Sequence, residues 1–283
     1  MPAWWPILAP YLAGVVIQRY SADLGMRLLY TVMLAIYLGS AFIVLRFLKE
    51  PSASPRQPLR LPVLVSALRQ AYQSIPGLVG QMPRSLKALA LVVLSFVING
   101  LTGSFWVVYA TERAGLTIEE WGLILLLESL VRLGLFLPAG VWVDRRGRTA
   151  SLNVALAIFT LATPLFTWLH GFTALLLVRL VMSAASVLGY LACIALMADL
   201  TPSRMRGQNM AALGQGGIEL GAVGAPGGPS VGYLIIPPVM LASLGGGYLY
   251  TLNPASPWIV AAGAGLLALL LSLVFIRDPD EKA

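Results

Sequence analysis

The chain has 283 residues, of which 58% are hydrophobic and only 11% are charged. Soluble globular domains contain about 25% charged residues, so this composition excludes an ordinary soluble domain and predicts a membrane protein. The net charge of +7 does not indicate nucleic-acid binding, because the basic residues lie in short loops between apolar segments.

The chain begins with an apolar segment that extends to about Ile17 and has no basic region before it. A cleaved signal peptide needs such a basic region, so we interpret the segment as a membrane helix. The single Cys193 excludes an internal disulfide, and the single His170 excludes a histidine metal cluster. We expect no cofactor.

Further apolar stretches follow along the chain. Each is long enough to cross a hydrocarbon core, which takes about 20 helical residues, and with the first segment they give the spans 4–18, 28–48, 88–110, 121–143, 150–168, 172–198, 209–250 and 257–276. We therefore predict an all-α polytopic membrane protein with about eight transmembrane helices. The one long polar connection, 49–87, opens with a Pro- and Ser-rich sequence and is predicted to be a linker between two membrane units.

The distribution of Lys and Arg predicts the orientation, because short cytoplasmic loops carry the excess of basic residues. If the N-terminus is cytoplasmic, fourteen basic residues lie inside and three outside, namely Arg19, Arg27 and Arg113. We therefore expect both termini in the cytoplasm, with the chain in a plasma or inner membrane. Four tryptophans near span ends are expected to anchor the helices at the membrane interfaces: Trp121, Trp142, Trp168 and Trp258.

The stretch 209–250 is too long for one straight helix, and it contains a Gly- and Pro-rich run around Pro226 to Pro229. Because glycine and proline break helices, we predict a half-helix or interfacial segment at about 209–225, a turn, and a true span at about 230–250. Backbone groups freed at the break must face protein or water, since lipid cannot bond them.

The most specific local pattern is the loop after the fourth span, which contains Gly140, Asp144, Arg145, Gly147 and Arg148 in the spacing G-x-x-x-D-R-x-G-R. Gly140 would let helices approach closely, Gly147 permits a tight reversal, and the arginines hold the loop in the cytoplasm. We call residues 140–148 the signature loop. A generic cytoplasmic hairpin would explain the arginines but not the whole spacing.

This spacing resembles the loop signature of the major facilitator superfamily, and its place before four further spans makes it similar to the second copy in that family. The turn from Ala198 to Pro202, with the nearby Arg204, Arg206 and Gly207, resembles the turn between the family's tenth and eleventh helices. Gly246 to Tyr250 resembles the end of the eleventh helix, and Arg179 with Gly189 is similar to an arginine motif, although Ser183 and Ala185 replace its usual glycines.

The resemblance implies a domain organisation. Residues 1–48 would be the last two helices of an N-terminal bundle, 49–87 a cytoplasmic linker, 88–277 a complete six-helix C-terminal bundle, and 278–283 a cytoplasmic tail. The first four helices of the family fold would be absent. In such transporters substrate binds between two bundles near the middle of the membrane.

Charged groups within the spans are candidates for substrate binding or proton coupling, because each is costly in lipid and needs a partner. Glu128 and Arg132 lie one helical turn apart and can pair. The pair is either structural or part of a substrate site, whereas Arg179 could snorkel to the interface, stabilise the fold or act in transport. Glu219 beside the predicted break could form an ion site or lie at the interface, and Asn99 is an uncharged candidate.

The sequence contains no nucleophile–base arrangement, phosphate-binding loop or metal cluster, so we expect no enzyme. The resemblance implies a secondary active transporter of a small solute, coupled to protons or another ion and working by alternating access. The alternative is a truncated fragment that does not transport alone and acts as a membrane partner or half-transporter. A third possibility is a small channel or a scaffold that does not transport. It ranks last, because we would expect such a protein to have the spans without the signature loop. Expected partners are a small-molecule substrate and the lipid bilayer, with no nucleic acid.

Overall fold

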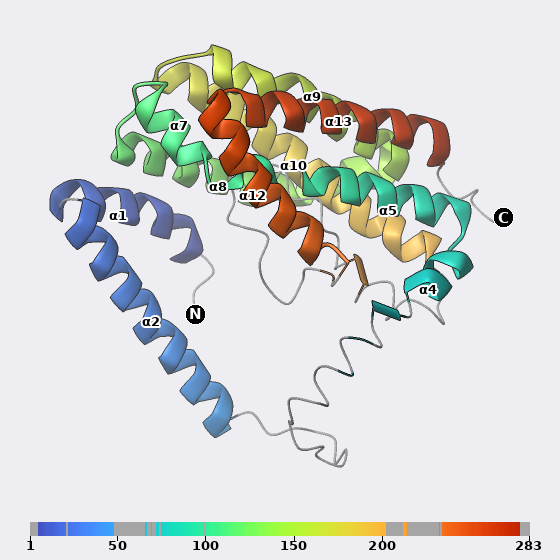
Figure 1. The fold of residues 1–283 in the computed structure, drawn as a ribbon, viewed down its shortest axis with the longest axis horizontal. Helices are drawn as coiled ribbons and strands as arrows, with labels where there is room; N and C mark the ends of the chain where they lie inside the picture. Colours follow the sequence, from blue (N-terminus) through green and yellow to red (C-terminus); the bar gives the residue numbers. More distant parts are fainter. Residues whose placement is uncertain are drawn as a thin grey trace. The chain divides into compact units, whose positions relative to one another are not determined.

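The computed structural model describes residues 5–20, 22–47, 66, 69, 72–73, 75–98, 100–201, 212–213, 232 and 234–277. These residues form helices and connecting turns, without a strand in the described ranges (Figure 1). The helices are α1 (Trp5–Tyr20), α2 (Ala22–Phe47), α4 (Ile75–Gln81), α5 (Arg84–Val97), α6 (Gly100–Gly103), α7 (Trp106–Glu112), α8 (Ile118–Arg146), α9 (Arg148–Trp168), α10 (Phe172–Leu200), α12 (Ile236–Leu252) and α13 (Ser256–Phe275).

Within these described ranges, six segments are long and apolar enough to cross a membrane: Asp23–Phe47, Arg84–Gly103, Ile118–Arg146, Arg148–Trp168, Phe172–Leu200 and Ser256–Phe275. Two shorter helices occupy the positions of two further predicted spans, α1 with 16 residues and α12 with 17. The chain is therefore an all-α, multi-pass integral membrane protein, as its apolar composition predicted.

The chain divides into two compact units. One unit comprises Met1–Gly14 and Met82–Ala283, and the other comprises Val15–Gln81. In the second unit, α2 exposes large apolar side chains along its length, such as Leu45 at 85% and Phe47 at 73%. A helix that is apolar on every side is typical of a lipid environment. The short helix α4 lies inside the segment predicted to be a linker.

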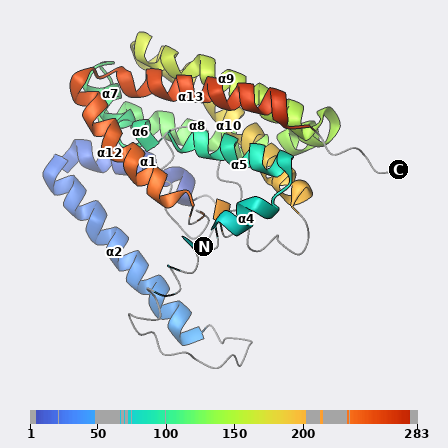
Figure 2. The same cartoon turned by 45° about the vertical axis from the view of Figure 1, so that its right-hand side comes forward.

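The larger unit is a bundle with its core around α10. This helix packs against α8 on one side and α9 on another, and α13 packs against both α9 and α5. Figure 1 and the turned view in Figure 2 both show α13 running between α9 and α5. Residues on α10 such as Met182, Ala192 and Cys193 are fully buried, so this helix lies at the centre of the bundle and is well placed to hold a polar site.

Local sequence signals explain several helix boundaries. α8 begins with a capping box, in which the Thr117 hydroxyl accepts from the Glu120 N–H and the Glu120 carboxylate accepts from the Thr117 N–H. α8 and α9 are separated by Gly147 alone, whose φ of 90° lies in the left-handed region that favours glycine. The predicted tight reversal at Gly147 is therefore confirmed.

Two predicted spans differ from the structure. For the predicted span 88–110, the segment long and apolar enough to cross a membrane is Arg84–Gly103, and the helix is interrupted: α5 ends at Val97 and the chain continues as the short helices α6 and α7. Gly100 and Gly103, which bound α6, weaken helical continuity there. For the predicted span 230–250, the structure shows α12 at Ile236–Leu252, whereas the proposed half-helix at 209–225 and the Pro226–Pro229 break lie outside the described residues apart from 212–213.

One close approach fixes α12 against α6. A Cβ added to Gly246 would lie 2.8 Å from the Cα of Leu101 and would also clash with its carbonyl oxygen. Since the obstacle is backbone, it cannot move aside by changing rotamer. Glycine at position 246 is therefore needed for the observed packing of the two helices.

Candidate functional site

The site begins with two charged residues on α8. Arg132 donates through Nη2 to Oε1 of Glu128 at 3.0 Å, and the residues lie four positions apart on one helix face. The sequence predicted this pair, and the structure shows it. The Glu128 side chain is 2% exposed and that of Arg132 is 19% exposed, so Glu128 is buried whereas the Arg132 side chain is only partly buried.

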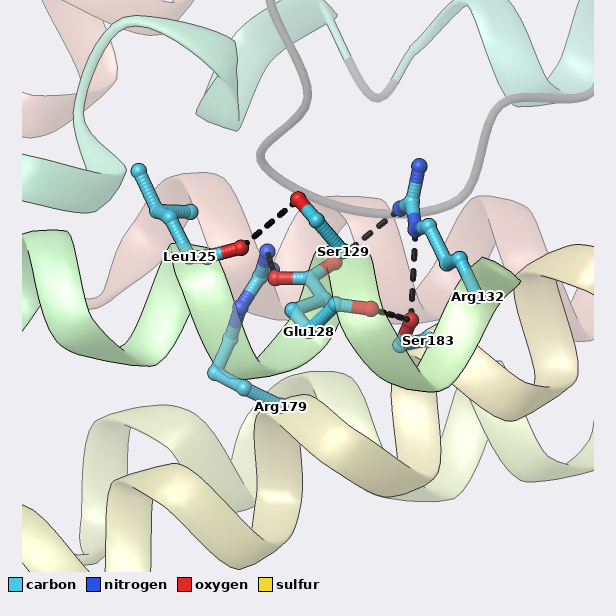
Figure 3. A network of polar contacts seen from close by, with 6 residues as sticks. All are labelled: Leu125, Glu128, Ser129, Arg132, Arg179 and Ser183. Atoms are coloured by element: carbon cyan, nitrogen blue, oxygen red, sulfur yellow. Dashed lines mark hydrogen bonds and ion pairs between the residues drawn. The ribbon is translucent and has the colours of Figure 1, made fainter. Parts of the chain in front are cut away.

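A second arginine reaches the same carboxylate from α10. Nη2 of Arg179 donates to Oε2 of Glu128, and both side chains are buried. Glu128 therefore bridges two guanidinium groups on different helices (Figure 3). The predicted possibility that Arg179 snorkels to the interface is wrong, because its side chain is 0% exposed. A buried carboxylate supplies the counter-charge that a desolvated arginine requires.

Ser183 completes the contact between the two helices. Its hydroxyl accepts from Nε of Arg132 at 3.2 Å and donates to the backbone oxygen of Glu128 at 3.2 Å. Ser183 lies four residues after Arg179, and Arg132 lies four residues after Glu128, so one turn of α10 matches one turn of α8 (Figure 3). We refer to Glu128, Arg132, Arg179 and Ser183 as the ion network.

Aromatic rings form the wall behind Arg179. Its guanidinium carbon lies 4.7 Å from the centre of the Trp106 ring and 5.6 Å from that of Trp121. Such cation–π contacts are stronger when the cation is desolvated, as this one is. In the described part of the chain, Nε and Nη1 of Arg179 have no hydrogen-bond partner. The arginine is therefore held by one carboxylate and two indole rings.

The wall continues into a larger aromatic cluster centred on Trp258. This side chain is 0% exposed, and its ring lies 5.6 Å from Trp106, 4.8 Å from Tyr109 and 5.8 Å from Phe166, measured between centroids. The cluster joins α7, α9 and α13 near one end of each helix. It is a rigid packed support behind the ion network.

The burial of these rings corrects part of the interface-anchor prediction. Trp121 and Trp258 are buried inside the protein, so they are not lipid anchors. Their neighbours explain the difference, since Trp121 packs on Arg179 and Trp258 packs on other rings. Trp142 at 46% and Trp168 at 69% are exposed, as an anchor requires.

Sequence reasoning missed Ser183, Trp106 and Trp121 as members of the site. One available signal was the four-residue spacing between Arg179 and Ser183, which places both on one face of α10. Another was that a buried arginine needs a carboxylate, and Glu128 was one of the two acidic residues singled out within the spans. No sequence pattern indicated which tryptophans would face inward.

Arg148 of the signature loop forms a second ion pair between helices. Arg148 at the start of α9 pairs with Asp199 near the end of α10, and both side chains are about one third exposed. In the last turns of α8, the Arg146 guanidinium lies 4.9 Å from the Trp142 ring centre. Among the described residues, no atom lies within 4 Å of a Cβ placed at Gly140, so the predicted close helix approach at this glycine stays a prediction.

Exchanging the charges of Arg148 and Asp199 should reveal their coupling. Arg148→Asp and Asp199→Arg should each lower the thermal unfolding midpoint, and the double variant should recover most of the loss because opposite charges again face each other. Partly exposed pairs contribute roughly 1 kcal/mol or less, so the shifts will be small but measurable. Arg145→Asp combined with Asp199→Arg is the matched control and should show no recovery. Strictly additive losses in the exchanged pair would contradict the interaction.

The other residues predicted from the sequence are not among the described contacts of the ion network. Asn99 and Glu219 lie outside the described residues, so their predicted roles remain proposals. Asp144 and Arg145 are exposed in the last turn of α8. Across the described ranges, no cluster of His, Cys, Asp and Glu could hold a metal ion.

The structure is a helical bundle whose helices are long and apolar enough to span a membrane, and a buried ion network lies between two of them. These features define a polytopic membrane protein with a polar site inside its spans. The family comparison agrees with the signature loop: the model of the Major Facilitator Superfamily matches residues 88–283. The chain therefore belongs to the major facilitator superfamily, a family of membrane transporters.

Curated proteins similar to this chain have names that are more specific than the family. Proteins named "Quinolone resistance protein NorA" from Staphylococcus aureus strains N315, MW2 and MRSA252 are each 26% identical to this chain over 196 residues. The match covers 68% of this chain and 44% of each relative. The chain thus spans less than half the length of the curated relatives that it matches.

Proposed function

We propose that the chain acts as a secondary transporter that moves a small solute across a plasma or inner membrane by alternating access. One observation carries this proposal: Glu128 bridges Arg132 and Arg179 inside membrane-spanning helices. Charged groups at such depth are costly and commonly mark solute or proton pathways. Membership of a transporter family supports the same function.

The network also suggests how an ion could be coupled to motion. The Glu128 carboxylate holds one arginine on its own helix and one on α10. Adding a proton to it would weaken both ion pairs at once, and the contact between α8 and α10 would loosen. We therefore propose Glu128 as a coupling residue, with the Arg148–Asp199 pair and the signature loop as a conformational contact at the predicted cytoplasmic end. Glu219 and Asn99 stay proposed as further site residues.

The relatives' name suggests the first solutes to test. Because those proteins are named for quinolone resistance, we propose that amphipathic organic molecules of this kind are substrates here as well. A second candidate function is a membrane partner or half-transporter that works only together with another polypeptide. The 44% coverage of the relatives favours testing it.

Reconstitution into proteoliposomes tests the transport proposal. Purified chain, with an imposed proton gradient, should drive movement of a fluorescent quinolone, and collapsing the gradient with an ionophore should stop it. Glu128→Gln should abolish the gradient-driven component of the flux, because an amide cannot take up and release a proton as a carboxylate does. Glu112→Gln, at the exposed end of α7, should retain this component. Absence of gradient-driven flux with the chain alone would contradict the first candidate; flux that appears only after adding a second polypeptide would establish the other.

A further inference from the structure

Several buried hydrogen-bond donors of the larger unit have no acceptor among the described residues. They are Nε and Nη1 of Arg179, Nε1 of Trp106, Nε1 of Trp258 and the hydroxyl of Tyr250. Leaving a buried donor without an acceptor is unfavourable, so nearly all buried donors in proteins have a partner from the protein or from ordered water. These four residues therefore need acceptors that the described part of the chain does not supply.

The four residues are neighbours in the aromatic cluster behind the ion network. The guanidinium carbon of Arg179 lies 4.7 Å from the centre of the Trp106 ring. The centroids of the Trp106 and Trp258 rings are 5.6 Å apart, and those of Trp258 and Tyr250 are 6.4 Å apart. The unpartnered donors thus form one connected group rather than scattered defects.

The protein itself can satisfy a donor in this cluster where an acceptor is in place. The Tyr109 hydroxyl, for example, donates to the backbone oxygen of Thr167 at 2.9 Å. For the other donors the competing arrangement is a dry one, in which aromatic faces accept N–H groups, and such contacts are weaker than ordinary hydrogen bonds. Water is the acceptor that buried polar groups without a protein partner commonly bind.

The group extends from one end of the bundle toward its interior. Tyr250 lies two residues before the end of α12 and Trp258 two residues after the start of α13. Arg179 lies seven residues after Phe172, the first residue of α10, which is about 10 Å along the helix. The donors near the helix ends are therefore close to a source of water, and Arg179 is the deepest of them.

We propose that internal water molecules bind these donors and extend from the end of α12 to Arg179. Nε and Nη1 of Arg179 are bonded to the same carbon as Nη2, which donates to Glu128 (Figure 3), so water bound there lies beside the Glu128 carboxylate. In the transport cycle, a role that rests on the proposed function, these waters deliver the proton that Glu128 takes up. A hydronium ion gives its proton to the carboxylate, leaving a neutral water molecule and a protonated carboxyl group.

Tyr250→Phe tests for bound water through the sign of its effect on stability. The substitution removes one hydroxyl and keeps the ring, which stacks on Phe105 at 4.7 Å. Since water bonds this hydroxyl in our proposal, its loss should lower the thermal unfolding midpoint by roughly 2–4 °C. A dry, unpartnered hydroxyl predicts a higher midpoint instead, because its removal relieves a desolvation cost. Tyr248→Phe is the matched control on the same helix; its side chain is 68% exposed, and the midpoint should not change.

Hydroxyl-radical labelling by radiolysis in heavy-oxygen water locates the internal waters in the unmodified full chain. Radicals formed from a bound water oxidise the side chain beside it, so Trp106 and Trp258 should take up heavy oxygen although they are 2% and 0% exposed. Phe159 on α9 is 1% exposed and has no polar side-chain atom, so it should stay unlabelled.

Either measurement can overturn the inference. Tryptophans as unreactive as Phe159 would contradict it, and so would an unchanged or higher midpoint in Tyr250→Phe. Neither readout involves flux, so these results are distinct from a failure of transport in proteoliposomes. Labelled tryptophans in a chain without proton-driven flux would support the waters and reject their role in proton delivery.

Discussion

Glu128→Leu is expected to lower the free energy of unfolding by about 3–5 kcal/mol, the usual cost of removing one partner of a buried ion pair. The reason is that Arg179 is fully buried and has Glu128 as its carboxylate partner. Two indole rings remain beside the arginine, but they cannot replace a full negative charge. Reversible unfolding of the purified chain in mixed micelles measures the change.

The control for this experiment is Glu112→Leu, which removes an exposed carboxylate at the end of α7. Exposed substitutions usually change stability by less than about 0.5 kcal/mol, so this variant should unfold close to the wild type. If Glu128→Leu also unfolds like the wild type, then Glu128 is not the counter-charge of a buried arginine, and the ion network has been assigned wrongly.

Trp258→Ala is the second substitution with a large expected effect. Trp258 is fully buried at the start of α13, and its ring contacts those of Trp106, Tyr109 and Phe166. Truncating it leaves a cavity in the wall behind Arg179, and a buried Trp→Ala change costs roughly 3–5 kcal/mol. We expect a markedly lower thermal unfolding midpoint, measured by loss of the monomeric peak in size-exclusion chromatography after heating.

Trp168 provides the matched control, because it lies at the end of α9 and is 69% exposed. Trp168→Ala removes the same number of atoms without opening an internal cavity, so its midpoint should stay near that of the wild type. Equal losses in the two variants would show that size of the side chain, rather than its place in the aromatic cluster, determines the effect.

Much of the fold follows from the sequence for a clear physical reason. In lipid every backbone polar group must be bonded within the helix, so apolar length alone placed α8, α9, α10 and α13 close to their observed bounds. The turn at Gly147 followed from the conformational freedom of glycine. The Glu128–Arg132 pair followed from the four-residue period of one helix.

The contacts of the site that join α8 to α10 could not be predicted in the same way. Arg179 and Glu128 are 51 residues apart, and an almost uniformly apolar helix such as α10 gives no pattern that shows which face turns toward which neighbour. The same uncertainty explains the errors at Trp121 and Trp258, since a tryptophan near a span end is compatible with either lipid or the protein interior. Ser183 could be recognised as a site residue only from the packing of α10 against α8, which brings its hydroxyl to Arg132.

The ion network is also the simplest link between the fold and the proposed transport. It contains the contacts through which a single carboxylate holds α8 and α10 together, and it is supported from behind by Trp106 and Trp121. Neutralising that carboxylate would weaken both contacts at once. In the proposed mechanism, proton uptake at Glu128 therefore acts directly on the packing of α8 against α10.

A double-mutant cycle between Glu128 and Arg179 tests this pairing most directly. Unfolding free energies are measured for the wild type, Glu128→Leu, Arg179→Met and the double variant. Residues in direct contact show coupling of about 0.5–3 kcal/mol, and for this buried ion pair we expect the upper part of that range, with the double variant less destabilised than the sum of the single ones. Losses that add within about 0.5 kcal/mol, as for distant sites, would show that Glu128 and Arg179 do not pair.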